Sequence, residues 1–275
     1  MLLQREKEAK DETIRLKSLS KKVAEFDFLN RDLIDGFAYG NIAVLQPTES
    51  GNDFNLSQME WDFIPDTWYG KPLDTHEKVE NWRRGYKDDK GKYIPGITTL
   101  NAMGEEMLLP HKIYRSSALE RRCLVLSTGF FEWMHHYPKN KRTGEPLKTS
   151  IKIPHYIYQK DKPYFFMVGI FKPWTDKVTG EIVNTVSIGT TPAPEGHLMA
   201  KVHNSKFRMP SILNKDMGWE WMLENPSEDR ITEIVTTQYP SELMGAWTID
   251  KSFKTSGNPK EAVVWSEYPE VESEL

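Results

Sequence analysis

Four runs of apolar, β-branched and aromatic residues follow one another between residues 121 and 191, with no helical pattern between them. They occupy residues 121–125, 155–158, 164–171 and 185–191. Residues 160–163, Lys-Asp-Lys-Pro, are typical of a hairpin connection between the second and the third run. Consecutive strands without crossover helices indicate an antiparallel or mixed sheet, and we expect this sheet to curl into a barrel.

Shorter signals predict the elements around this sheet. Further strands are expected at residues 42–45, 53–64 and 211–213. Helical spacing of apolar residues is found at residues 5–25, 75–86, 217–223 and 231–235, and a loop with a short helix is expected over residues 192–203. Residues 88–96 are polar and contain Gly and Pro, which indicates an exposed insertion.

We therefore predict one domain of the α+β class over residues 1–275, with a curled antiparallel or mixed β-barrel-like core and peripheral helices. A helical segment at residues 1–25 and an acidic tail at 267–275 would lie at its periphery. No apolar run approaches about 18 residues and no signal-peptide pattern is present, so we expect a cytoplasmic protein that neither enters a membrane nor is secreted. The single cysteine, Cys123, excludes an internal disulfide framework.

The net charge of −4 at pH 7 argues against a protein that holds nucleic acid by bulk attraction. A nucleic-acid-binding role therefore needs a local basic surface. The candidates for it are Arg115, Arg121, Arg122, Lys201, Lys206 and Arg208. A second basic group is formed by Lys139, Lys141, Arg142, Lys148 and Lys152, and we interpret it as a solvated loop because Pro and Gly residues mark a connection there.

Glu132 and His203 are the side chains most suited to proton transfer. Glu132 stands between aromatic residues, where desolvation would raise its pKa; the alternative is a strand-end glutamate that faces water. His203 lies in a polar turn, and a pKa near ~6.5 makes histidine the usual proton carrier at neutral pH, although a hydrogen-bonding role is the alternative. Asn101 can position a substrate by donating and accepting together, or can simply form a turn.

Four motifs connect these residues to a known family. In chain order they are Trp61, Phe63-Ile64-Pro65 and Trp68; Asn101-Ala102; Arg122 to Trp133; and His203 with Arg208-Met209-Pro210. Over about residues 37 to 225 the chain thereby resembles the SRAP domain family, whose members act on abasic sites in single-stranded DNA. The resemblance implies an SRAP-like fold with a β-barrel core.

The resemblance also implies catalytic roles. Glu132 and His203 would move protons, and Asn101 would orient the sugar. In the family a cysteine follows the initiator methionine and captures the abasic-site aldehyde, whereas this chain has Leu2. The nucleophile expected here is therefore the α-amino group of Met1, whose pKa near ~8 leaves a neutral fraction at pH 7.

Contacts to DNA are implied in the same way. Arg208 would bind a phosphate through two hydrogen bonds, and aromatic rings would stack on unpaired bases. The residues expected at the DNA are Arg208, Arg115, Lys206, Trp61 and Trp68, with Trp133 as a further stacking face. Two departures from the family pattern affect this surface: Met103 replaces an arginine, and the gap between His203 and Arg208 is longer.

These roles imply an abasic-site processing protein of the DNA damage (SOS) response, acting on single-stranded DNA with abasic sites. Crosslinking or lyase chemistry is expected in a weaker, reversible form because of Leu2, and the initiator-methionine peptidase activity associated with the family would have little purpose on a Met-Leu terminus. A non-covalent single-stranded DNA-binding module and a scaffold for protein partners stay open as alternatives. We expect a monomer, without cofactor and without metal.

Overall fold

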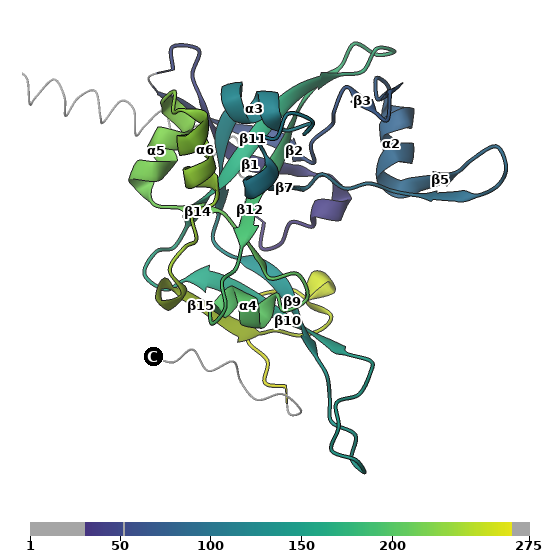
Figure 1. The fold of residues 1–275 in the computed structure, drawn as a ribbon, viewed down its shortest axis with the longest axis vertical. Helices are drawn as coiled ribbons and strands as arrows, with labels where there is room; N and C mark the ends of the chain where they lie inside the picture. The colour runs from purple at the N-terminus through teal and green to yellow at the C-terminus, as the bar shows by residue number, and fades with distance from the viewer. Residues whose placement is uncertain (1–30, 52, 266–275) are drawn as a thin grey trace, which may run out of the picture.

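A five-stranded barrel forms the centre of the computed structural model, which describes residues 31–51 and 53–265 (Figure 1). Its strands are β1 (Asn41–Pro47), β2 (Phe54–Trp61), β8 (Arg122–Ser127), β11 (Phe165–Thr175) and β12 (Ile182–Pro192). They pair in the closed order β12–β2–β1–β8–β11–β12, and only the β12–β2 pair is parallel among these five. Because the barrel is closed, each of the five strands is paired on both sides over at least part of its length.

Successive side chains on these strands enter two different apolar clusters. Val44, Cys123 and Met167 belong to one cluster, whereas their neighbours Leu124 and Val168 belong to the other. This alternation is the period of two that a strand with two buried faces requires. The second cluster is covered by helices α3 (Arg115–Glu120), α5 (Lys215–Leu223) and α6 (Glu228–Val235).

Three short strands extend the barrel sheet beside the predicted site. They are β7 (Asn101–Met103), β13 (Arg208–Pro210) and β14 (Ile212–Leu213). Met103 of β7 and Pro210 of β13 both pair with Thr190, so these two strands lie on opposite edges of β12. The end of β12 thus carries Asn101 on one side and Arg208 on the other.

A second, three-stranded sheet lies beside the barrel and contains β9 (Phe130–His136), β10 (Ile151–Gln159) and β15 (Met244–Thr248), in the order β15–β10–β9. The predicted hairpin through residues 160–163 is therefore wrong, because β10 and β11 belong to different sheets. Both edges of β10 are already paired with β9 and β15, and Lys160 N donates to Leu243 O, so the chain crosses to the barrel here.

The remaining elements are short. Two small ribbons are formed by β3 (Thr67–Trp68) with β4 (Lys71–Pro72) and by β5 (Gly85–Lys87) with β6 (Tyr93–Pro95). The other helices are α2 (His76–Arg84), α4 (Leu198–Val202) and the 3-10 turns η2 (Gly36–Ala38), η3 (Gly104–Glu106), η4 (Ser241–Leu243) and η5 (Phe253–Thr255). Side chains of Thr75, Asn214 and Ser227 accept from backbone N–H groups at the starts of α2, α5 and α6, as helix N-caps do.

The predicted fold class is confirmed: the structure is α+β, with a barrel core and peripheral helices. Strands at residues 42–45, 53–64 and 185–191 and helices at 75–86, 217–223 and 231–235 are present with small shifts at their ends. The polar segment 88–96 connects and partly forms the β5–β6 ribbon. The predicted segments 1–25 and 267–275 lie outside the described residues, so the prediction of one domain over the whole chain stays a prediction. None of the described helices is long and apolar enough to cross a membrane.

Arg122 holds the helices in place and does not contribute to a basic surface, contrary to the sequence-based expectation. Its guanidinium is buried and donates to the backbone oxygens of Ala118, Trp221 and Glu224 at 2.7 to 3.0 Å. These oxygens lie near the C-terminal ends of α3 and α5, where helices leave carbonyl groups without partners. Arg122 therefore satisfies two helix ends at once.

Candidate active site

The structure brings Glu132 and His203 together from segments 71 residues apart in the sequence. Glu132 lies on β9, and His203 is the residue that ends α4. His203 Nδ1 is 3.8 Å from Glu132 Oε1, and the two side chains are 20% and 25% exposed. A carboxyl group and an imidazole are thus neighbours at a site that solvent and a substrate can reach.

Asn204 fixes the turn after α4 against β9. Its Oδ1 accepts from His135 N at 2.9 Å, and its Nδ2 donates to His135 O at 3.0 Å. The turn then closes through Phe207, whose φ of 53° is left-handed and whose N donates to His203 O at 2.9 Å. This turn accommodates the longer gap between His203 and Arg208 while it keeps His203 beside Glu132.

The backbone assigns a role to each nitrogen of His203. Nδ1 lies 3.0 Å from Arg208 O, and because a carbonyl oxygen only accepts, Nδ1 carries a proton. In the neutral ring Nε2 is then the nitrogen that can accept a proton. The hydrogen bond to Arg208 O also fixes the orientation of the ring.

Burial raises the pKa of Glu132 above its usual value. The positive charges of His203 and Lys206 and a hydrogen bond from Trp133 N oppose this effect without cancelling it. A raised pKa moves a carboxyl group closer to the pH at which it can both give and accept a proton. The environment of Glu132 therefore suits a proton carrier.

The raised pKa of Glu132 predicts a pH-dependent cost to stability. The pKa of Glu132 in the folded protein exceeds its unfolded value of about 4.3, so the folded state binds its proton more tightly. Ionisation of the carboxyl therefore lowers the free energy of unfolding, and this loss is complete above the folded-state pKa. We expect Glu132→Gln to be more stable than the unchanged protein at pH 7, and the difference to disappear below about pH 4. Urea unfolding curves of both proteins between pH 4 and pH 8 measure this; a difference independent of pH would contradict it.

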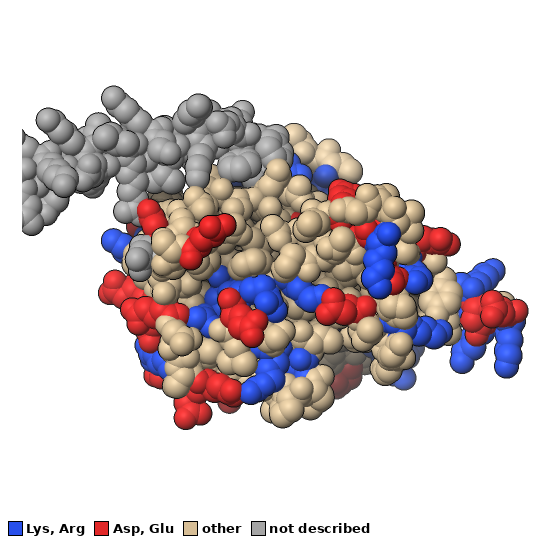
Figure 2. All heavy atoms as spheres, turned by 90° about the horizontal axis from the view of Figure 1, so that it is seen from above, with Lys and Arg blue, Asp and Glu red and all other residues tan. Residues whose placement is uncertain are grey.

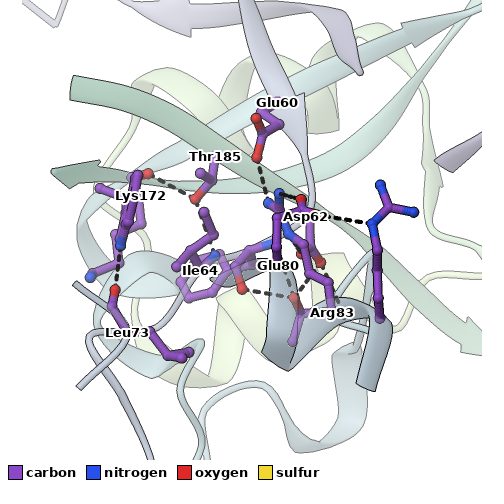
Figure 3. Close-up of polar contacts among 12 residues, drawn as sticks. Glu60, Asp62, Ile64, Leu73, Glu80, Arg83, Lys172 and Thr185 are labelled. Atoms are coloured by element: carbon purple, nitrogen blue, oxygen red, sulfur yellow. Dashed lines mark hydrogen bonds and ion pairs between the residues drawn. The ribbon is translucent and has the colours of Figure 1, made fainter. Parts of the chain in front are cut away.

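Asp62 and Arg83 belong to a polar network (Figure 3), and contacts of Asp62 with Thr99 hold the segment that leads to Asn101. Asp62 is fully buried, and its carboxylate accepts from Thr99 N at 3.1 Å, Thr99 Oγ1 at 2.5 Å and Arg83 Nε at 2.8 Å. The preceding residue, Trp61, donates its Nε1–H to Leu100 O at 3.0 Å. Residues 99 and 100 are thus fixed directly before Asn101, whose side chain is exposed on β7.

Arg83 is the centre of this network. It also pairs with Glu60, and its guanidinium lies 4.4 Å from the ring centre of Tyr39. The sequence predicted none of these roles, because Asp62 and Arg83 lie 21 residues apart and no motif links them. The only local signal was that Asp62 occupies a position inside the tryptophan motif.

Both arginines predicted to bind phosphate are already paired with carboxylates. Arg208 donates to both oxygens of Glu105, at 2.5 and 3.0 Å, and to Thr190 O at 2.8 Å. Arg115 donates to Glu228 at 2.7 and 3.1 Å. A phosphate at either position must therefore compete with a carboxylate. The pairing also lowers the pKa of Glu105 against the opposing effect of its burial.

The other predicted site residues differ in accessibility. Lys206 is exposed, and no carboxylate of the described residues lies within ion-pair distance of it. Trp61 and Trp68 are both partly buried, and the Trp68 ring centre is 5.8 Å from that of Trp82. Met1 lies outside the described residues.

Charges of both signs alternate on the face of the molecule seen from above in Figure 2. This face lies at the end that carries α3, α5 and α6 in Figure 1. The described residues visible on this face form no broad area of one sign.

The chain is similar to proteins of a known family. A sequence model of the family described as SOS response associated peptidase (SRAP) matches residues 35–256. The abasic site processing protein YoaM of Bacillus subtilis is 26% identical over 216 residues, which cover 78% of this chain and 77% of that protein. YoqW of the same organism is 24% identical over 215 residues, or 78% of each chain, and is also called an abasic site processing protein.

Solved structures show the same fold. A Bacteroides thetaiotaomicron protein of 28% identity has a TM-score of 0.63 and covers 84% of each chain. A Bordetella bronchiseptica protein of 17% identity has a TM-score of 0.53, with 77% of this chain and 85% of that chain covered.

Proposed function

The chain belongs to the SOS response associated peptidase (SRAP) family, and on this premise we propose that it processes abasic sites in DNA. Relatives called abasic site processing proteins match about four fifths of its length, which supports the proposal. The observation that carries it is the pair Glu132 and His203, a carboxyl with a raised pKa beside an imidazole. The same proposal includes that Asn101 orients the sugar and that the DNA substrate is single-stranded.

The chemistry proposed is capture of the abasic-site aldehyde. The ring-closed sugar opens when a base takes the proton of its C1 hydroxyl and an acid protonates the ring oxygen. A neutral amine then adds to the aldehyde carbon, and loss of the hydroxyl as water gives an imine. Ring opening and loss of water each need one group that accepts a proton and one that donates a proton, and Glu132 and His203 Nε2 are the groups proposed for these roles.

The nucleophile proposed is an amine from outside the described residues. Cys123, the only cysteine of the chain, is completely buried, and burial raises the pKa of its thiol. A protonated thiol without access to solvent is a poor nucleophile. We propose the α-amino group of Met1 for this role. An amine alone forms a reversible imine, whereas an adjacent thiol would form a stable thiazolidine.

Incubation with single-stranded DNA that carries one abasic site tests the proposal. We expect an adduct on denaturing gels after borohydride reduction, and none that survives heating without reductant. Mass spectrometry of the adduct identifies the attached residue. Intact DNA of the same sequence is the control. Binding without any adduct in either lane would instead support the non-covalent binding module, and a heat-stable adduct without reductant would show that a thiol takes part.

A further inference from the structure

The connection between β9 and β10 forms an arm that projects from the rest of the molecule (Figure 1). We define the arm as residues 137–150. It continues the strand that carries Glu132, and it lies at the end of the molecule opposite to α3, α5 and α6. No role in the fold or in the chemistry proposed above uses it.

The arm is held by its own hydrogen bonds. Asn140 N donates to Glu145 O, Gly144 N to Asn140 O and Leu147 N to Pro138 O, each at 2.8 Å. Asn140 Oδ1 also accepts from Arg142 N at 2.9 Å. These hydrogen bonds give the arm a defined backbone conformation, which a flexible linker does not have.

The arm carries an excess of positive charge, although the chain as a whole is acidic. Its 14 residues hold four cations and one carboxylate, Glu145, which gives a net charge of +3 in a chain with a net charge of −4. The cations are Lys139, Lys141, Arg142 and Lys148, all exposed. No ion pair joins any of them to a carboxylate of residues 31–51 or 53–265, whereas Arg83, Arg115 and Arg208 are all paired.

A comparable ribbon elsewhere in the chain lacks this excess. The β5–β6 ribbon carries Lys87, Lys90 and Lys92, but Asp88 and Asp89 lie between them. The positive charge of the arm is therefore not a general property of exposed hairpins in this protein.

The position of the arm relates it to Glu132. Lys139 follows Glu132 by seven residues, which along an extended strand corresponds to about 23 Å. His135 lies between Glu132 and Lys139 in the sequence, and Asn204 holds the turn after α4 to it. Lys206 belongs to this turn, and its positive charge lowers the pKa of Glu132 against the effect of burial. Positive charge is thus present both beside Glu132 and on the arm that continues its strand.

We propose that the arm binds the phosphate backbone of the DNA strand that flanks the abasic site. The proposal rests on the proposed function for the position of the lesion at Glu132. At a phosphate spacing of about 3.4 Å along one strand of a duplex, the arm would reach backbone about seven nucleotides from the lesion, and fewer on an extended single strand. Lysine and arginine on an exposed ribbon supply affinity without reading sequence.

Two variants with the same change in charge test this. The arm variant carries Lys139→Gln, Lys141→Gln, Arg142→Gln and Lys148→Gln, and the control variant carries Lys71→Gln, Lys87→Gln, Lys90→Gln and Lys92→Gln, all at exposed positions. Each is titrated with single-stranded DNA of about 25 and about 5 nucleotides that carries one central abasic site, at several salt concentrations. Fluorescence anisotropy gives the affinity.

For the arm variant we expect affinity for the long DNA to fall at least about 10-fold at low salt. The slope of log affinity against log salt should become shallower by about 2 to 3, since each lost phosphate contact on a single strand contributes about 0.7. Affinity for the short DNA should not change, and the control variant should behave as the unchanged protein.

Three results would overturn the proposal: no change with the long DNA, the same loss with the short DNA, or the same loss in the control variant. Failure of the proposed function is seen separately. If the unchanged protein binds long DNA equally with and without the abasic site and forms no adduct, the proposed function fails, while the difference between the two variants still decides the role of the arm.

Discussion

Replacing Glu132 by glutamine is expected to slow formation of the borohydride-trapped adduct by about 10²- to 10⁴-fold, the range over which a single acid or base contributes to a rate. Glutamine has nearly the same shape, but its amide cannot carry the proton that ring opening and loss of water require. His203 would keep its position, because its ring is held by Arg208 O and its turn by Asn204. Rates are measured under single-turnover conditions between pH 5 and pH 8.

The control for this prediction is Glu77→Gln, which removes an exposed carboxylate on α2. It should leave the rate unchanged. DNA affinity of the Glu132→Gln protein, measured by anisotropy, should change much less than the rate. A rate within a factor of about 3 of the unchanged protein would show that Glu132 carries no proton in the reaction.

Removal of the buried carboxylate of Asp62 is expected to reduce the free energy of unfolding by about 3 to 5 kcal/mol, as breaking a buried ion pair commonly does. Asp62→Ala removes one of the two carboxylates that hydrogen-bond to the buried guanidinium of Arg83, and it leaves Thr99 N without its acceptor. The double variant Asp62→Ala, Arg83→Met should be more stable than Asp62→Ala alone, because it also removes the buried cation.

The matched control is Asp66→Ala, which breaks the ion pair between Asp66 and Lys172. The side chain of Asp66 is 83% exposed. Such exposed pairs contribute about 0 to 1 kcal/mol. Urea unfolding at pH 7 compares the four proteins. Equal losses for Asp62→Ala and Asp66→Ala, or a double variant less stable than the single one, would contradict the account of this network.

The elements of the fold that depend on local pattern were predictable, and those that depend on pairing across the chain were less so. The apolar, β-branched runs at residues 42–45 and 121–125 identify strands without knowledge of their neighbours. The pairing of β10 does not follow from its own residues, since β9 and β15 compete for its two edges. Local turn signals at residues 160–163 therefore predicted a hairpin that the sheets exclude.

The same distinction applies to the candidate site. Motif order singled out Glu132 and His203 as a pair, and the structure brings them to within 3.8 Å of each other. The pairing of Arg208 with Glu105 joins residues 103 positions apart, and no motif indicated it. Ion pairs between residues far apart in the sequence cannot be predicted from motif spacing, because the fold determines which carboxylate lies beside each guanidinium.

The position of β9 at the edge of its sheet has a consequence for self-association. An edge strand exposes N–H and C=O groups that can pair with the same strand of another copy. Asn204 occupies both backbone groups of His135 with its amide, as a neighbouring strand would. The arm that continues β9 adds a net charge of +3, which repels an identical arm. Two features thus oppose edge-to-edge aggregation through the strand that carries Glu132. They are the hydrogen bonds of the Asn204 side chain to the backbone of His135 and the electrostatic repulsion between the arms of two copies.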